Sequence, residues 1–349
     1  MAGNGVGSWL VADSLWWGTG APVDARALRV TGDGDVTGGP VTVAEIPPGA
    51  PRRRLPGTLL PGLCDAHVHT DLVDPATVRA GGIAAVWDLG GVPARLVALV
   101  ARSADPASGL PRMRIAGPFL TAPGGYPSDR AWAAPGSWRE VRSTDDAAAA
   151  VAECRAGGAT IVKAVLHTRA PTMPAPVLRA VVEAAHAAAL PVVAHAEGPG
   201  AVAAACEVGV DLLAHTPWTE AVDDGLLRTA ADSGMSWIST LDIHGWGTAT
   251  AEAATAVDNL RRFLAHGGSV RYGTDLGNGP LPPAVNRREV RALQSVGLTP
   301  ADVLAAMTTD RVGVPPCWLP GGLDMDPDRF ADSLATARVV GPEVRPRRQ

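Results

Sequence analysis

Two histidines separated by a single residue are the first chemical signal in the chain. His67 and His69 close the segment GLCDAHVH at 62–69. Residues i and i+2 of a β-strand point to the same face, so both imidazoles can reach one point. Neutral imidazole binds Zn, Fe, Ni and Cu, and a carboxylate ligand adds charge compensation. The pair alone is weak support for a metal site, because a lone buried histidine is more often a hydrogen-bonded core residue.

Lysine occurs only once in the chain, at Lys163. The Lys+Arg total is 30, so arginine occupies every other basic position. Arginine stays charged, whereas lysine can lose its proton and then act as a nucleophile or be covalently modified. We therefore interpret Lys163 as a functional residue; the alternative is that one lysine has survived by chance.

Short apolar runs alternate with alanine-rich amphipathic segments from residue 58 onward. The runs predict eight strands, at 62–69, 84–90, 112–120, 160–166, 191–197, 211–217, 236–243 and 269–275. The segments between them predict helices, at 74–81, 93–104, 144–157, 174–189, 199–208, 222–233, 250–266 and 282–296. A further helix is expected at 299–314. In 174–189 the apolar residues recur at the helical spacing i, i+3, i+4, i+7.

Eight strands that alternate with helices predict parallel βαβ units closed into an α/β (β/α)8 TIM barrel over residues 58–314. An open doubly wound sheet is disfavoured, because no GxGxxG follows the first strand. Active sites of such barrels lie at the carboxyl ends of the strands. Metal-capable side chains from five strands therefore converge on one mouth, namely His67, His69, Lys163, His195, His215 and Asp275.

The two flanks of the barrel have a different composition. Residues 1–57 hold short Val/Trp/Ile-rich pieces broken by Gly, Asp and Pro, which predict a small accessory β module. The C-terminal segment 315–349 is expected to return to this module and to end in a frayed tail.

Composition narrows the class of protein. The 349 residues are 46% hydrophobic and 19% charged, which is compatible with a sizeable core. A net charge of −5 argues against nucleic acid as a partner. No apolar run approaches the roughly 20 residues that span a bilayer, so no membrane association is expected. The N-terminus lacks the pattern of a secretory signal, and four scattered cysteines are expected to be free thiols, which together predict a cytoplasmic protein.

Five motifs in chain order resemble those of the metal-dependent amidohydrolase superfamily. PGLCDAHVH resembles the PGxxDxHxH opening of that superfamily, and the later landmarks are IVKAV, VVAHAEG, LLAHTPW and YGTDLG. AGGIAAVWDLGG, GPFLTAPGGY and GLTPADVLAAMTTDRVGV resemble segments of its imidazolonepropionase-like and prolidase-like branch. The resemblance covers nearly the whole chain.

The resemblance implies a role for each matching residue. His67, His69 and Asp275 would hold one divalent metal ion, with Zn as the expected metal. His195 and His215 would hold a second ion, and Lys163, as its CO2-derived carbamate, would bridge the two. Asp275 would accept a proton from the attacking water and pass it to the leaving nitrogen, while Asp65 is either a supporting residue near the histidine pair or simply structural.

The chain departs from the family pattern at several positions that concern the substrate. Trp87 stands where relatives have Arg, Tyr126 stands where they often have His, and LHTRAP replaces a Gly-rich turn. The loop 121–140 exceeds ordinary length and is the best candidate for a lid. The substrate-binding candidates are Trp87, Tyr126, Trp132, His167, Arg169, Trp218 and His244.

The resulting hypothesis is a hydrolase that cleaves an amide or cyclic amide C–N bond of a small, apolar or aromatic-bearing substrate. A homo-oligomer is compatible with the sequence. Two alternatives stay open: a one-metal deaminase of a heterocycle, and a non-catalytic scaffold on the same fold. The deaminase is disfavoured because it typically uses HxxE, whereas Glu197 follows His195 at +2; the scaffold is disfavoured because all six ligand positions are filled.

Overall fold

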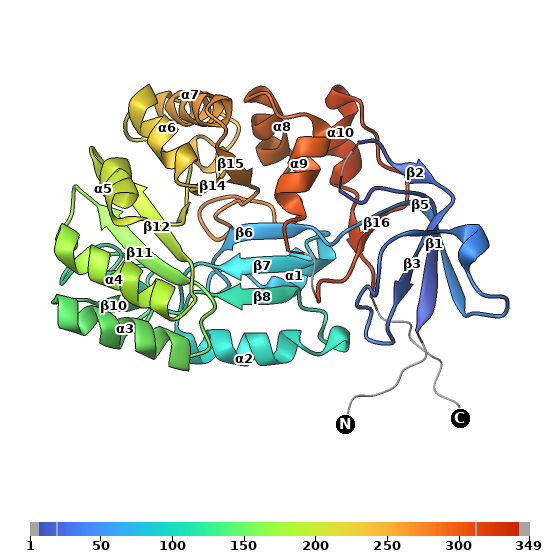
Figure 1. The fold of residues 1–349 in the computed structure, drawn as a ribbon, viewed down its shortest axis with the longest axis horizontal. Coiled ribbons are helices and arrows are strands. Elements are labelled where there is room, and N and C mark those ends of the chain that lie inside the picture. The colour runs from blue at the N-terminus through green and yellow to red at the C-terminus, as the bar shows by residue number, and fades with distance from the viewer. Residues whose placement is uncertain (1–6, 19, 311–312, 342–349) are drawn as a thin grey trace.

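The parallel strands of the chain form two sheets enclosed by helices (Figure 1). The computed structural model describes residues 7–18, 20–310 and 313–341. One parallel sheet has the order β10-β9-β11-β12-β13-β14-β15, and the other has the order β6-β7-β8. Their strands are β6 (Cys64–Val68), β7 (Ala85–Asp88), β8 (Arg112–Ile115), β9 (Phe119–Thr121), β10 (Trp138–Glu140), β11 (Val162–His167), β12 (Val192–Glu197), β13 (Leu212–Leu213), β14 (Ser236–Ile238) and β15 (Ser269–Arg271).

Helices connect successive strands, as the alternating pattern predicts. They are α1 (Pro75–Ala80), α2 (Pro93–Ser103), α3 (Thr144–Ala156), α4 (Ala175–Ala187), α5 (Ala201–Val208), α6 (Asp224–Asp232), α7 (Ala251–Ala265), α8 (Arg287–Ser295), α9 (Pro300–Met307) and α10 (Pro327–Leu334). In α4, Val177 and Val181 are buried, and Ala180 and Ala184 pack against the same core. The mixed α/β class with parallel strands is therefore confirmed.

Several predicted elements have different bounds in the structure. The helix expected at 299–314 is the shorter α9 (Pro300–Met307), and the strands expected at 211–217, 236–243 and 269–275 keep only residues near their start, as β13, β14 and β15. The single strand expected at 112–120 is two strands, because Gly117 adopts a positive φ of 73° and Pro118 has no backbone N–H to donate. The helix expected at 282–296 starts only at Arg287. Its N-cap is Asn286, whose side chain accepts a hydrogen bond from the Arg288 amide.

Backbone hydrogen bonds join the two parallel sheets in two places. At the end of β8 the Ile115 carbonyl accepts from the Thr160 amide, which lies just before β11. At the second place, where the edge strands β6 and β15 lie, the Ala66 amide donates to the Tyr272 carbonyl, and Val68 pairs with Leu276 in a parallel bridge. The segment that follows β15 therefore runs alongside β6.

Buried Asp65 holds that second junction together. Its Oδ1 accepts from the amides of His67 and Thr274, at 3.1 and 3.0 Å, and its Oδ2 accepts from the Thr274 hydroxyl at 2.6 Å. Burial raises the pKa of Asp65 to about 7, although these hydrogen bonds oppose the shift. The segment that contains Thr274 also passes close to β14. A glycine is required at position 273, because a Cβ there would lie 2.3 Å from a methyl carbon of Ile238. We refer to this Asp65–Thr274 contact as the strap.

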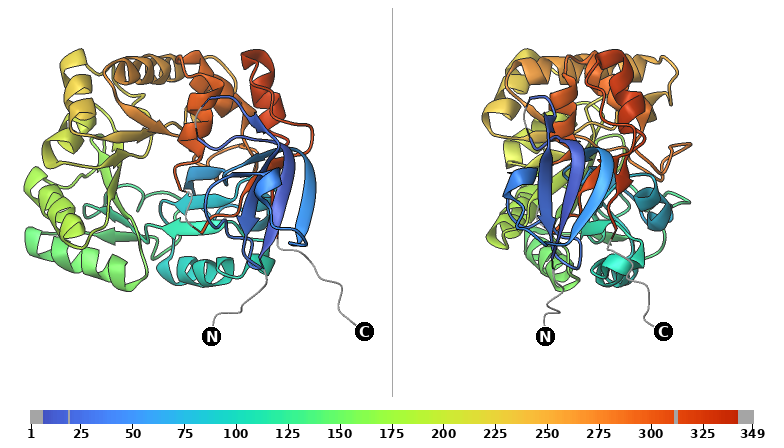
Figure 2. Two further views of the ribbon diagram at one scale, coloured as in Figure 1. Left: turned by 45° about the vertical axis from the view of Figure 1, so that its right-hand side comes forward. Right: turned by 90° about the vertical axis from the view of Figure 1, so that its right-hand side faces the viewer.

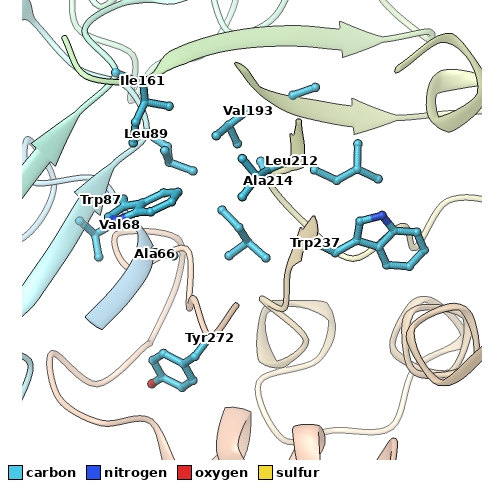
Figure 3. Close-up of a cluster of buried hydrophobic side chains, with 14 of the residues drawn as sticks. Ala66, Val68, Trp87, Leu89, Ile161, Val193, Leu212, Ala214, Trp237 and Tyr272 are labelled. Carbon is cyan, nitrogen blue, oxygen red and sulfur yellow. The ribbon is translucent and has the colours of Figure 1, made fainter. Parts of the chain in front are cut away.

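Side chains from both parallel sheets share one hydrophobic core (Figure 3). Val68 from β6, Val193 from β12 and Trp237 from β14 are each fully buried. Trp237 stacks on Phe263 of α7 with ring centres 3.9 Å apart. Strands that are buried on both faces read as nearly continuous apolar runs, which explains why these strands could be recognised in the sequence.

The third sheet combines strands from both ends of the chain (Figure 2). Its order is β17-β16-β5-β1-β3-β4, with β2 paired to β1. The strands are β1 (Ser8–Leu15), β2 (Val23–Asp24), β3 (Arg26–Val30), β4 (Val41–Thr42), β5 (Arg52–Leu60), β16 (Cys317–Leu319) and β17 (Arg338–Val339).

Two details of the flanks refine the sequence analysis. Because β5 continues to Leu60, we propose a domain boundary after that residue rather than at 57/58. The C-terminal segment contains α10 besides its two strands, and the end that is expected to fray, 342–349, lies outside the described residues.

Two further expectations concern the whole chain. All four cysteines are free, as predicted. Among the described residues no helix has the length and apolar character needed to cross a bilayer.

The strap makes a testable contribution to stability. Replacing Thr274 with Val keeps the shape of the side chain but leaves Oδ2 of the buried Asp65 without its hydroxyl donor. We expect Thr274→Val to lower the free energy of unfolding by about 1–3 kcal/mol, measured by urea denaturation. The control is Thr172→Val in the segment between β11 and α4, where Thr172 is exposed and the change should stay within about 0.5 kcal/mol. Equal effects in the two variants would contradict the assigned role of the strap.

Candidate active site

The six predicted metal-capable side chains line a single cavity. This cavity has a volume of about 330 Å³. The exposed fraction of every one of the six residues is 7% or less. β6 and the residue after it supply His67 and His69, β11 supplies Lys163, and β12 supplies His195. The segments after β13 and β15 supply His215 and Asp275.

One group of donor atoms gathers at the carboxyl end of β6. Nε2 of His67 and Nε2 of His69 lie 3.1 and 3.2 Å from the same oxygen, Oδ1 of Asp275. These three residues place their donor atoms within 4.8 Å of one another, which suits a metal ion. Asp275 has a positive φ of 57°, and its Oδ2 accepts a hydrogen bond from the side-chain amide of Asn278. Such a conformation is strained for a residue other than glycine and is typical of functional sites.

The remaining two histidines continue the cluster around the cavity. The ring centre of His215 lies 4.7 Å from that of His67 and 5.1 Å from that of His195. His195 also belongs to a second group of possible ligands, with His167 and Glu197. The sequence analysis did not predict this group. Glu197 follows His195 at i+2 on β12, the same spacing that identified His67 and His69, so this signal was present in the sequence.

Each of the four cluster histidines has one ring nitrogen tied to a hydrogen-bond partner. In three of them Nδ1 makes this hydrogen bond. The partner is the Ala214 carbonyl for His67 (2.8 Å), the Gly90 carbonyl for His69 (3.0 Å) and the Thr240 hydroxyl for His215 (3.0 Å). In His195 the hydrogen-bonded nitrogen is Nε2, which lies 3.0 Å from Oε2 of Glu197. Metal-binding histidines usually hold their second nitrogen in this way, which fixes the tautomer and the ring orientation.

Charge within the cluster follows from burial. Burial holds the pKa of His67 and of His215 well below the ordinary value, so both rings are neutral and able to donate a lone pair. Burial alone would raise the pKa of Asp275, but the surrounding histidines outweigh it and keep that pKa well below its usual range.

Lys163 is buried without a partner for its charge. Its side chain makes no ion pair and no hydrogen bond within the described part of the chain, and its Nζ lies 5.9 Å from the ring centre of Phe119. Burial lowers the pKa of Lys163 to about 7, against the opposing effect of Asp275 and Asp88. A large fraction of this amine is therefore uncharged near neutral pH.

Aromatic residues form much of the cavity wall, and two of them come from the loop between β9 and β10. Tyr126 stacks on His195 with ring centres 4.9 Å apart, and Trp132 packs beside Tyr126 at 6.0 Å. Trp218 meets the rings of His195 and His215 edge to face. Phe119, Leu72 and Ile243, which the sequence analysis did not single out, complete the apolar wall.

Four other predicted substrate residues lie outside this wall. His167 is buried behind it, next to Tyr126 and His195, and His244 stacks on Trp218 at 4.9 Å. Arg169 is exposed and does not line the cavity. Trp87 is buried elsewhere: its indole N–H donates to Asp310, and it lines a separate cavity.

The position of Trp87 corrects the sequence-based expectation. Arg114 and Arg271 place their guanidinium groups over its ring, 4.4 and 4.8 Å from the centre. A tryptophan with a satisfied N–H between two arginines is a packing residue, so Trp87 does not face the substrate.

Comparison with known proteins supports the fold at low sequence identity. No protein-family profile and no curated protein sequence matches the chain. Solved structures do match: the A. niger ochratoxinase has a TM-score of 0.76 at 18% identity over 94% of this chain and 93% of its own. A Xaa-Pro dipeptidase with bound methionine has a TM-score of 0.76 at 16% identity over 95% and 96%.

A third solved structure, an amidohydrolase, covers 97% of this chain and 100% of its own, with a TM-score of 0.72 at 19% identity. Each match spans nearly all of both chains, so the similarity extends over the whole described architecture. The chain therefore has the fold of the prolidase-like amidohydrolases, which the motifs of its sequence indicated.

Proposed function

We propose that the chain is a metal-dependent hydrolase that cleaves the C–N bond of an amide or cyclic amide in a small substrate. The observation that carries this proposal is the cluster of four histidines around one cavity that also contains Asp275 and Lys163. Each histidine has one ring nitrogen held by a supporting partner, and the second nitrogens of His67 and His69 both meet Oδ1 of Asp275. Solved structures of the same fold include a dipeptidase and an amidohydrolase, which supports the same class of reaction.

The two parallel sheets would form a single (β/α)8 barrel in which β8 and β9 together make one strand of the barrel and β10 is an addition beside β9. The Thr160–Ile115 hydrogen bond and the contacts of β6 with residues 272–276 support this arrangement, because they connect the sheets in two places. The donor cluster then occupies the carboxyl end of the barrel, where enzymes of this fold have their active sites.

The donor set fits two divalent ions. We assign His67, His69 and Asp275 to the first ion, and His195 and His215 to the second, with Zn as the expected metal. Lys163 would bridge them after its uncharged amine adds to CO2, which forms an N–C bond and releases one proton. The product is an anionic carbamate with two oxygens. The absence of any ion pair for Lys163 within the described residues supports this assignment.

Asp275 is placed to move protons. When bound, the metal ions would supply a polarised carbonyl and a water of lowered pKa. The Asp275 carboxylate would take one proton from the attacking water and deliver it to the leaving nitrogen. Its contact with Asn278 and its own strained backbone hold the carboxylate in place for this transfer.

The cavity wall favours an apolar or aromatic group on the substrate. Tyr126, Trp132 and Trp218 present flat apolar surfaces beside the donor cluster. With about 330 Å³ available, the cavity suits a small molecule rather than a polymer.

Metal content of the purified, metal-loaded protein separates the candidate functions. Near two equivalents per chain would support the binuclear hydrolase. One equivalent would favour the one-metal deaminase, and none would favour the scaffold.

Replacing a proposed ligand should remove metal without unfolding the protein. We expect His67→Ala or His195→Ala to lower metal content and to abolish amide hydrolysis, while the circular dichroism spectrum stays that of the wild type. His186→Ala is a matched control, because that histidine is exposed on α4 and pairs with Asp211. Full metal content and normal turnover in His67→Ala would refute the assignment of the site.

The carbamate assignment predicts that arginine cannot replace Lys163. Lys163→Arg should lose metal nearly as completely as Lys163→Ala, because a guanidinium keeps a positive charge and does not form the carbamate. Metal analysis measures this loss directly, and addition of a short carboxylic acid to Lys163→Ala should restore part of the activity by supplying bridging oxygens. An active Lys163→Arg protein with two bound ions would contradict the binuclear mechanism.

A further inference from the structure

We propose that Glu197 recognises a cationic nitrogen of the substrate, and that the substrate is an aminoacyl amide with an uncharged leaving group. This inference rests on the proposed hydrolase function and names the substrate class for the same cavity. It follows from the placement of Glu197, from the cations near the cavity and from the nature of its wall.

Glu197 presents a carboxylate to the cavity beside the donor cluster. It is the last residue of β12 and lines the same cavity as His195, and its side chain is 24% exposed. Oε2 is occupied by His195, whose Nε2 lies 3.0 Å away, and it is also 3.3 Å from Nδ1 of His167. Oε1 makes no hydrogen bond with any described residue. One carboxylate oxygen is therefore free to accept a hydrogen bond from a ligand.

Within the part of the chain that the structure describes, no lysine or arginine makes an ion pair with Glu197. Among the described residues that line the cavity, Lys163 is the only lysine or arginine, and it lies within the donor cluster. Burial acts to raise the pKa of Glu197, but contact with His195 and the charges of His167 and Arg130 lower it overall. Arg130 itself packs on the Tyr126 ring, 5.3 Å from its centre, and forms its ion pair with Asp129 at 3.4 Å. Arg169, one of the predicted substrate-binding candidates, is exposed and does not line the cavity. A free carboxylate next to Glu197 would meet like charge, whereas an ammonium group would meet opposite charge.

The wall around Glu197 is compatible with a cation. Trp132 and Trp218 line the cavity that contains this carboxylate. The indole ring is the best aromatic partner of an ammonium group, and the exclusion of water strengthens this attraction. A cavity that holds both an acidic side chain and indole rings therefore suits an amine better than an acid.

The position of Glu197 decides where the amine lies on the substrate. Because Glu197 is two residues from His195, a nitrogen bound to Glu197 lies next to the carbonyl that is to be attacked. An α-ammonium group on the acyl side satisfies this condition. The reaction is then the addition of water to an aminoacyl amide, which breaks the C–N bond and yields the amino acid and a free neutral amine.

Two anilides that differ at a single position test the inference. We expect wild-type, metal-loaded protein to hydrolyse L-phenylalanine 4-nitroanilide with a kcat/KM at least about tenfold above that of N-acetyl-L-phenylalanine 4-nitroanilide. In Glu197→Gln this preference should fall to near unity, mainly through a higher KM for the amine-bearing anilide. The amide oxygen of glutamine can still accept from His195, so metal content should match the wild type.

Glu252→Gln, on the exposed surface of α7, is the control and should keep the preference of the wild type. A wild-type preference for the acetylated anilide would overturn the inference. The same conclusion would follow if Glu197→Gln kept the preference, or if it lowered turnover of both anilides equally together with metal content. In that last case Glu197 would act only by orienting His195.

A binding measurement distinguishes this inference from the proposed function. Calorimetry should show that 2-phenylethylamine binds the metal-loaded protein at least about tenfold more tightly than 2-phenylethanol, and that Glu197→Gln abolishes the difference. Equal binding of the two probes to the wild type would overturn the role of Glu197. Selective binding of the amine without hydrolysis of any amide would instead refute the hydrolase and leave the recognition site standing.

Discussion

The strap between Asp65 and Thr274 is the contact on which the arrangement of the site depends. It joins β6, the first strand of one parallel sheet, to the segment that follows β15, the last strand of the other. His67 and His69 lie two and four residues after Asp65, and Asp275 lies directly after Thr274. The same hydrogen bonds that connect the two edges therefore bring two imidazoles to within 3.2 Å of one carboxylate oxygen, although the residues are more than 200 positions apart in the chain.

Orientation of the histidines depends on a second layer of contacts. Backbone carbonyls of Ala214 and Gly90 each accept from one Nδ1, and the Thr240 hydroxyl is hydrogen-bonded to a third, so that the Nε2 atoms point toward the cavity and Asp275. Thr240 has a positive φ of 42°, as Asp275 has one of 57°. The surrounding fold stabilises both strained residues, as is common where the geometry of a site is built in before a ligand arrives.

Glu197 is an exception within this second layer, because it is charged and only partly buried. It orients His195 through one oxygen and leaves the other oxygen for a ligand. One residue can thus link the proposed metal centre to the choice of substrate. The aromatic residues of the loop between β9 and β10 cover the same region, so charge selection and apolar contact would operate side by side.

The sequence by itself determined the alternation of strands and helices, the resemblance to a family and the six metal-capable residues that the structure brings to one cavity. Five of these residues stand at or near the end of a buried apolar run, and Lys163 is the single lysine of the chain. The rule that residues i and i+2 share a strand face also applied to Glu197. The sequence could not show that Trp87 packs against Arg114 and Arg271, since these two arginines come from other strands. Nor could the sequence show which groups form hydrogen bonds with the ring nitrogens of the four histidines. Backbone carbonyls have no sequence signature, and only the tertiary structure decides which of them lies beside a given ring.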